Sequence, residues 1–490
     1  MWCIRDDHRA DLGGVRGAKH NERRGNDIRE ASKAEGWKTA MTESGNAASE
    51  GKPLRYIIAA QMIDCTGEPP VKDPVIVVQG TRIARVGTRQ TIQLPRDAEV
   101  VDCGGCTLLP GLMDLHIHTM MFNCVSFHNY RVAQWEITPE LQQMYGLFHA
   151  QLCFDMGFTT LRDLGLSSSR GLLVAEACAI RDAIQAGILE GPRMLVGAFT
   201  TITGSHLDLI QPRAALRVGF QTADGPWELR KLARTSLRAG CDVIKTCTSG
   251  GGGTDKEEPD IRNMTQEELN AIVDEAHAFH KICAVHCFTP QSQRMSLAAG
   301  ADTIEHMVFS DAETIGMIKE KGVYMTPTLA HRTDHAIQVR KEHGTPQFVL
   351  SKMKALQESC FRTFQDMYKA GVNIAMGTDM GFDPEMGSNA KELEIYVKLG
   401  MSPMHALQTA TRNAARAIKL DHELGTLEQG KLADVVAVAG DPLADIACLQ
   451  AKNNIQVVMK EGKIHADRRA GHSKNIATAE PGSWKIIDNL

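Results

Sequence analysis

The amino-acid sequence predicts an α/β fold, a (β/α)8 TIM barrel with a small β-sandwich domain formed from both ends of the chain. Within residues 111–423, apolar β-branched runs alternate with longer helical patterns, which indicates repeated βα units and a parallel sheet. Short β-like runs divided by Gly- and Pro-containing turns occur just before and just after this stretch. These two sequence patterns together predict one β domain into which a large barrel is inserted.

Length and composition exclude several classes of protein. The chain has 490 residues, 23% of them charged and 43% hydrophobic, and 54 Lys and Arg against 59 Asp and Glu give a net charge of −5. This is ordinary globular composition, without the basic surface that nucleic-acid binding or a polybasic membrane anchor requires. No run of 18 apolar residues is present, so we expect no transmembrane helix. We expect a small-molecule substrate and neither a nucleic acid nor a membrane as partner.

The 13 cysteines bear on the cellular compartment. Their number is odd, and they are scattered along a chain far larger than a disulfide-dense secreted module. We interpret them as reduced thiols, which predicts a cytoplasmic protein. A homo-oligomer is the expectation for a soluble protein of this kind, because most soluble oligomers are symmetric assemblies of one chain.

The first 50 residues are predicted to be a disordered leader. Residues 1–40 are rich in charge and contain no apolar stretch that could serve as the core of a signal peptide. Met41 precedes a polar run typical of a natural start, so residues 1–40 are interpreted as an upstream extension or arm. After the leader we expect a composite β domain at 54–110 and 424–467, the barrel at 111–423 and a C-terminal tail at 468–490.

The elements follow from this division. The composite β domain takes its strands from runs at 56–60, 75–78 and 82–87 and, after the barrel, from 433–438 and 455–463. The barrel strands are expected to end near His118, Asp163, Gly197, Thr246, His286, His306, Thr328 and Asp379. A long helix after Pro346, with apolar residues at helical spacing, should pack on the barrel: Met353, Leu356, Cys360, Phe364 and Met367.

One alternative concerns the fold and another concerns the loop at residues 250–253. A doubly wound open sheet is the second choice of fold, but the first βα turn lacks the G-x-G-x-x-G fingerprint of a dinucleotide site. The glycine run 250–253 follows a strand, yet no Gly-Lys-Ser/Thr ends it. We therefore expect a mobile loop there rather than a phosphate cradle.

The strand ends carry candidate metal ligands. Alternate residues of a strand share a face, so His116 and His118 point the same way at the end of the first barrel strand. His286, His306 and Asp379 end three further apolar runs. A single buried histidine is usually a core residue, but the C-terminal ends of barrel strands meet at one mouth, where His and carboxylate ligands can hold a metal ion together.

Lys245 ends the fourth barrel strand and should enter the same mouth. An ammonium beside a divalent ion is repelled, so an inward lysine there needs an explanation. One is a structural salt bridge. The other is that the desolvated, neutral amine captures CO2 and forms an anionic carbamate that bridges two ions. The sequence leaves both open.

These residues resemble the ligand pattern of the amidohydrolase superfamily. More narrowly, residues 55–467 resemble its imidazolonepropionase-like and Xaa-Pro dipeptidase group, with ochratoxinase, molinate hydrolase and phenylurea hydrolase among the relatives. Besides the candidate ligands, the resemblance rests on residues 157–165 (GFTTLRDLG), 304–306 (IEH), 377–379 (GTD) and 430–434 (GKLAD).

The resemblance implies a two-metal site. His116, His118 and Asp379 would surround the more buried ion, His286 and His306 the more exposed one, and carboxylated Lys245 would bridge them. Relatives often read His-Ala-His-Gly on the fifth strand, whereas this chain reads His-Cys-Phe-Thr at 286–289. The second histidine of that motif is absent here, and a substrate contact from it is absent with it.

The implied function is a metal-dependent hydrolase that cleaves a C–N bond of an amide, peptide, carbamate or urea. Two divalent ions, zinc first and manganese, cobalt or iron as alternatives, would make a bridging hydroxide available at neutral pH. Asp379 would accept a proton from the water and return it to the leaving nitrogen, and Lys245 would act as carbamate. The enzymatic alternative is a mononuclear cyclic-amide hydrolase or deaminase. An alternative of another class is a scaffold protein, but a scaffold would have no physical reason to retain this set of ligands.

Two observations bear on the substrate. His206, in the Gly-Ser-His sequence after the third strand, resembles a stretch that relatives place over the substrate, and is equally compatible with an ordinary loop histidine. The mouth is also expected to be rich in soft side chains, which favours a hydrophobic or aryl substituent on the substrate. These are Met120, Met121, Cys124, Cys247, Cys287 and Met380.

Overall fold

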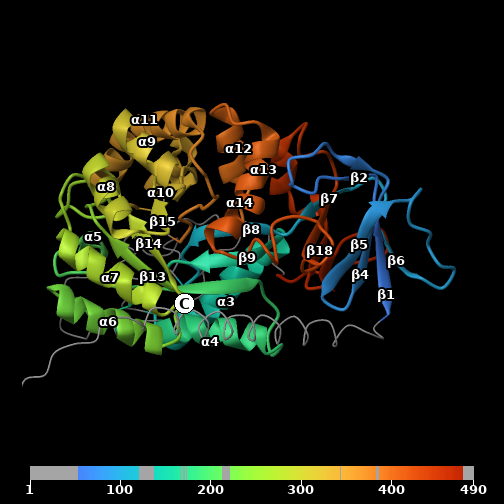
Figure 1. Ribbon diagram of the computed structural model, residues 1–490, viewed down its shortest axis with the longest axis horizontal. Coiled ribbons are helices and arrows are strands. Elements are labelled where there is room, and N and C mark those ends of the chain that lie inside the picture. Colours follow the sequence, from blue (N-terminus) through green and yellow to red (C-terminus); the bar gives the residue numbers. More distant parts are fainter. Residues whose placement is uncertain are drawn as a thin grey trace, which may run out of the picture. The chain divides into compact units, whose positions relative to one another are not determined.

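The computed structural model describes residues 53–120, 137–165, 167–168, 171–172, 174–211, 221–342, 344–381 and 386–477. The predicted leader at 1–50 and residues 478–490 of the predicted tail lie outside this description. Figure 1 shows strands from the beginning and the end of the chain side by side, next to a larger unit of alternating strands and helices. Both parts of the predicted fold class are therefore confirmed.

Two sheets form the composite β-sandwich. The first has the order β5-β4-β1-β6 and the second the order β19-β18-β17-β7-β2-β3. Their strands are β1 (Leu54–Ile58), β2 (Gln61–Met62), β3 (Val71–Lys72), β4 (Pro74–Gln79), β5 (Arg82–Thr88), β6 (Glu99–Asp102), β7 (Thr107–Pro110), β17 (Val435–Val438), β18 (Ile455–Lys460) and β19 (Lys463–Asp467).

The two ends of the chain meet in the second sheet. β7 pairs antiparallel with β17, and Leu109 lies opposite Val436. Inward residues of both sheets share one apolar core, in which Ile57 and Ile76 of the first sheet pack with Val435 of the second. Each short strand buries too little surface to be stable alone, so the N-terminal strands depend on partners more than 300 residues later in the chain.

One predicted strand is two strands. The run at 455–463 contains a hairpin between β18 and β19, with Glu461 and Gly462 at its tip. Both residues have positive φ, 50° and 74°, as a two-residue turn between antiparallel strands requires. The β-like composition on both sides of the turn hid it in the sequence.

Seven parallel strands build most of the barrel, in the spatial order β16-β15-β14-β13-β12-β9-β8. They are β8 (Leu112–Ile117), β9 (Phe158–Asp163), β12 (Arg193–Phe199), β13 (Val243–Cys247), β14 (Ile282–His286), β15 (Thr303–Glu305) and β16 (Tyr324–Thr326). Each ends within about two residues of the position that the sequence predicted.

An irregular eighth segment closes the barrel. Residues 374–380 bridge β16 through Met325 and Ile374 and bridge β8 through Ile117 and Met380, both in parallel. The eighth strand was predicted to end at Asp379, and Asp379 has a positive φ of 59°. That conformation is incompatible with a regular strand, so the last strand is reduced to isolated bridges around a candidate ligand.

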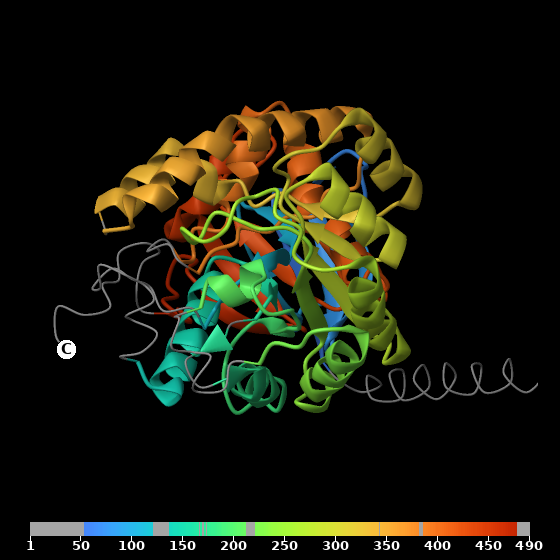
Figure 2. The ribbon, with the colours of Figure 1, turned by 90° about the vertical axis from the view of Figure 1, so that its left-hand side faces the viewer.

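Helices surround the strands, as Figure 2 shows. They are α3 (Pro139–Asp155), α4 (Val174–Gln185), α5 (His206–Leu209), α6 (Pro226–Arg238), α7 (Gln266–Ala278), α8 (Pro290–Ala299), α9 (Ala312–Lys321), α10 (Asp334–Glu342), α11 (Gln347–Ala370), α12 (Lys391–Lys398), α13 (Pro403–Thr409) and α14 (Arg412–Ala417). Three short 3-10 helices, η3 (Ala330–Arg332), η4 (Ile446–Gln450) and η5 (Lys452–Asn454), and the two-residue strands β10 (Ser167–Ser168) and β11 (Gly171–Leu172) complete the described elements.

The helix boundaries follow local chemistry. Thr265 and Glu268 form a reciprocal capping box at the start of α7, which satisfies two otherwise unpaired backbone N–H groups. The predicted helix after Pro346 is α11, and its five predicted apolar residues are all buried. Within the described ranges, none of the helices combines the length and the apolar composition that crossing a membrane would need.

Candidate metal centre

Three predicted ligands converge at the C-terminal mouth of the barrel. His116 lies in β8, His118 directly follows it, and Asp379 lies in the eighth segment. Asp379 Oδ1 is 3.4 Å from His116 Nε2 and 3.2 Å from His118 Nε2. One ligand atom from each of the three residues lies within 4.8 Å of the other two, which is a spacing that one ion can span.

The other ring nitrogens of these histidines have fixed partners. His116 Nδ1 lies 2.8 Å from Glu305 Oε2, and His118 Nδ1 lies 2.6 Å from the carbonyl oxygen of Gly165. An acceptor at Nδ1 keeps the proton there and leaves the Nε2 lone pair directed at Asp379. Two such nitrogens and a carboxylate fit a divalent metal ion.

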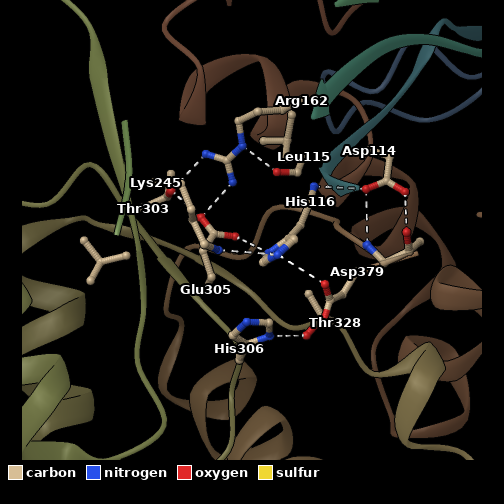
Figure 3. Close-up of polar contacts among 12 residues, drawn as sticks. Asp114, Leu115, His116, Arg162, Lys245, Thr303, Glu305, His306, Thr328 and Asp379 are labelled. Atoms are coloured by element: carbon tan, nitrogen blue, oxygen red, sulfur yellow. Dashed lines mark hydrogen bonds and ion pairs between the residues drawn. The ribbon is translucent and has the colours of Figure 1, made fainter. Parts of the chain in front are cut away.

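A buried ion pair supports His116 from behind. Arg162 and Glu305 are fully buried and joined by a 2.7 Å contact between Nη2 and Oε1, and Arg162 also donates to Thr303 Oγ1 and to the carbonyl of Leu115 (Figure 3). Burial by itself would raise the pKa of Glu305, but Arg162 and His116 outweigh it and hold this pKa far below its usual range. Glu305 is therefore an anion that accepts from His116.

The position of Asp379 depends on a second buried carboxylate. Asp114 in β8 accepts from Thr378 Oγ1 and from Asn389 Nδ2, each at 2.7 Å, and burial raises its pKa to about 6. A Cβ on Gly377 would lie 2.9 Å from the backbone nitrogen of His116, so only glycine lets the eighth segment approach β8 this closely. The Asp379 N–H then donates to the His116 carbonyl at 2.6 Å.

His286 and His306 form the neighbouring wall of the mouth. Their ring centroids are 4.7 Å apart, and the ring centroid of His306 is 4.9 Å from that of His116. His306 Nδ1 lies 2.7 Å from Thr328 Oγ1, and His286 Nε2 lies 3.1 Å from the Gly250 carbonyl. Burial, reinforced by neighbouring positive groups, lowers the pKa of both rings well below the usual value. Each ring is thus neutral and has one nitrogen left for an ion.

Lys245 reaches the centre from β13. It is 2% exposed, and its Nζ lies 3.4 Å from His116 Nε2. Among the described residues no carboxylate lies within 4.0 Å of this nitrogen, so the salt-bridge explanation has no partner there. Burial is the main reason that the pKa of Lys245 is lowered, against the opposing effect of Glu305 and Asp379.

His206 also lies at the mouth. It begins α5, and its ring stacks on His286 with centroids 4.2 Å apart and planes 20° from parallel. Its Nδ1 lies 2.7 Å from Glu257 Oε2, and Glu257 also accepts from the backbone N–H groups of Gly251 and Gly253. The glycine run is therefore tied to the buried Glu257 beside a candidate ligand.

The structure adds residues that the sequence interpretation missed. Arg162 and Glu305 were not predicted, because Glu305 adjoins the candidate ligand His306 and strand alternation would direct these two side chains to opposite faces. His331 was not predicted either, since it lies in η3 beyond the seventh strand. Its Nε2 is 3.8 Å from Asp379 Oδ2. Burial would raise the pKa of Asp379, but His116, His118 and His331 together hold it well below its usual range.

The apolar lining differs from the expected one. Cys287 points away from the mouth and contacts Ser296 of α8, as its alternation with His286 requires. Aromatic rings contact the candidate ligands instead. Phe199 lies 6.5 Å from His118, and Phe288 stacks on His286 at 4.4 Å between centroids. Met121 and Cys124 lie outside the described residues.

Comparison with known proteins identifies the class. Residues 107–465 match the Amidohydrolase family, so the chain belongs to this family, and the resemblance seen in the sequence is confirmed. It is a hydrolase that acts on C–N bonds.

Individual members of the family are similar to this chain over most of its length. A Xaa-Pro dipeptidase crystallised with methionine in its active site is 31% identical, with a TM-score of 0.75 over 84% of this chain and 99% of that one. Ochratoxinase from Aspergillus niger is 28% identical over 85% of this chain and 88% of its own length. Imidazolonepropionase from Pseudomonas syringae pv. tomato is 25% identical over 75% of this chain and 88% of its own length.

Proposed function

We propose that this chain is a metal-dependent hydrolase that cleaves the C–N bond of an amide, peptide, carbamate or urea carrying a hydrophobic or aryl group. The observation that carries the proposal is the convergence of His116, His118 and Asp379 within 4.8 Å at the mouth of the barrel. The similarity to ochratoxinase and to a Xaa-Pro dipeptidase supports it, as do the aromatic rings of Phe199 and Phe288 beside the candidate ligands.

The metal ligands follow from the free ligand atoms. His116, His118 and Asp379 would hold one divalent ion, zinc being the first candidate, and His286 with His306 a second. Such ions lower the pKa of bound water and polarise a carbonyl group. Lys245, buried between the two sets and lacking a carboxylate partner, would join them as a carbamate formed with CO2.

The protein's own groups supply proton transfer and substrate placement. Asp379 is ionised and lies within 3.8 Å of three histidine rings, so it can accept a proton from water and deliver it to the leaving nitrogen. His206 stacks on His286 and is the proposed substrate contact from the loop after β12. The odd number and scattered positions of the cysteines support the proposal of a cytoplasmic protein.

The test combines a substrate panel with a rescue experiment. N-acyl amino acids, dipeptides, aryl amides, phenylureas and thiocarbamates are assayed on metal-replete protein, and the proposal expects turnover in at least one C–N class. Lys245→Ala should lose activity and regain part of it with short carboxylic acids, which replace the carbamate. Full activity of Lys245→Ala would favour the mononuclear alternative.

A further inference from the structure

Arg332 has no role in the proposed metal binding or proton transfer. It is the last residue of η3, directly after His331, and only 6% of it is exposed. Within the described parts of the chain its guanidinium has neither a hydrogen-bond acceptor nor a carboxylate within ion-pair distance. Burial is the main cause that lowers its pKa. An unpaired buried charge is costly, so its retention indicates a partner that arrives from outside.

The position of the guanidinium points to the active site. Arg332 Cζ lies 5.6 Å from the centre of the Phe288 ring. The same ring stacks on His286 and stands edge-on to His306, with centroids 4.4 and 5.3 Å away. One aromatic ring therefore separates the guanidinium from two proposed metal ligands.

The backbone that carries Arg332 is fixed. Glu392 of α12 accepts from the N–H groups of Leu329 and Ala330 at 2.7 and 2.5 Å, and Gln357 of α11 donates to the Arg332 carbonyl at 2.8 Å. Contacts from two helices thus hold the loop after β16. A side chain on such a support is already placed for a ligand and loses little freedom on binding.

We propose that Arg332 is a specificity residue that binds a carboxylate carried by the substrate near its scissile C–N bond. The planar guanidinium can donate two parallel hydrogen bonds to a carboxylate while it stays over the Phe288 ring. The inference rests on the proposed function and narrows it, because amides of amino acids and dicarboxylic acids carry such a group and simple phenylureas and thiocarbamates do not.

The activity test uses substrates that differ only in charge. N-acetyl-L-phenylalanine and N-acetyl-L-phenylalaninamide place the group on the amine side, and N-phenylsuccinamic acid and its methyl ester place it on the acyl side. In one pair the wild type should prefer the acid, and Arg332→Gln should reduce that preference in kcat/KM on the order of 100-fold. Arg332→Lys should reduce it less. The control is Arg362→Gln, which changes an exposed arginine of α11 and should leave the preference intact.

A binding measurement separates this inference from the proposed function. Calorimetric titration of the same pairs into full-length protein, with metal and after chelation, needs no turnover. Binding of the acid that is at least 10-fold tighter than that of its neutral counterpart in wild type, and equal in Arg332→Gln, supports the inference even if no compound is hydrolysed. A preference for the acid that is the same in wild type and Arg332→Gln, or no preference in wild type, would overturn it.

Stability gives a further readout. Methionine is a long, unbranched side chain that carries no charge, so Arg332→Met should raise the Tm of the substrate-free protein, as expected where a binding residue is held at a cost to folding. A Tm several degrees lower would identify Arg332 as a structural residue and contradict the proposal.

Discussion

The mouth of the barrel and the seam between barrel and β-sandwich treat buried charge in opposite ways. In the seam, Asp434 before β17 accepts from Thr159 of β9 at 2.8 Å and from Arg193 of β12 at 2.9 Å. Arg193 Nη2 in turn lies 2.6 Å from Glu461 Oε1. Charges of both signs are present and satisfied, as a contact that holds two parts together requires.

At the mouth, the Arg162–Glu305 pair is balanced, but two other buried cations lack a near anionic partner in the described part of the chain. Lys245 and Arg332 are buried without a carboxylate in reach among the described residues, and the His306, Thr328 and Asp379 backbones have positive φ angles of 72°, 54° and 59°. Unpaired buried charges and strained backbone reduce the stability of a fold. They are typically found at functional sites, where they contribute to ligand binding or catalysis. We infer that the charged residues of the seam stabilise the fold, whereas those of the mouth serve ligand binding.

The largest effect is expected at the mouth. Asp379→Asn should reduce kcat about a thousand-fold or more, because the amide cannot accept the proton that a carboxylate takes from water. Asparagine tolerates the left-handed backbone of this position, so folding should survive. Steady-state kinetics and a thermal melt check both, and activity close to that of the wild type would contradict the role of Asp379.

The seam should show the reverse pattern. Asp434→Ala removes the buried carboxylate that accepts from Arg193, from Thr159 and from the backbone N–H of Glu461, and it should lower the free energy of unfolding by about 3 kcal/mol while kcat/KM stays within about twofold. Denaturant unfolding and kinetics on the same preparation measure the two quantities.

Asp274→Ala is the matched control for the seam. It breaks an ion pair with Arg230 in which the Asp274 side chain is 67% exposed, and should cost less than about 1 kcal/mol. Equal costs for the two variants would remove the distinction between the seam and an ordinary surface pair.

A smaller effect concerns pH. Burial lowers the pKa of His149 in α3 to about 4, against about 6.5 in an unfolded chain. Between these values the unfolded state binds a proton that the folded state does not, so this contribution to stability is complete above about pH 6.5 and lost as pH falls. From pH 7 to pH 5 the wild type should lose about 2 kcal/mol more than His149→Gln. Denaturant unfolding measures this difference. If the free energies of unfolding of the two proteins change in parallel with pH, the proposed contribution of His149 is contradicted.

Much of the fold was predictable because the strands carry their own signal. Continuous apolar runs marked the seven barrel strands, and short alternating runs marked the sandwich. Two features failed for local reasons. The Glu461-Gly462 turn lies inside a β-like run, and the last barrel strand is broken by the backbone conformation of Asp379.

The candidate site was less predictable away from strand ends. His116, His118 and Asp379 could be anticipated because strand ends meet at the mouth of a barrel. His331 and Arg332 lie in a three-residue helix after a loop, where no periodicity indicates direction. Their approach to Asp379 and Phe288 depends on contacts from α11 and α12, which only the folded chain brings together.

We propose that the mouth holds two divalent ions and that hydrolysis requires them. The most direct measurement is the metal content of the full-length protein by mass spectrometry, alongside activity before chelation, after chelation and after metal is restored. We predict close to two equivalents of metal per chain, and activity that disappears when the metal is removed and returns when it is restored. One equivalent would contradict the two-ion site, and activity that persists without metal would contradict the proposed chemistry altogether.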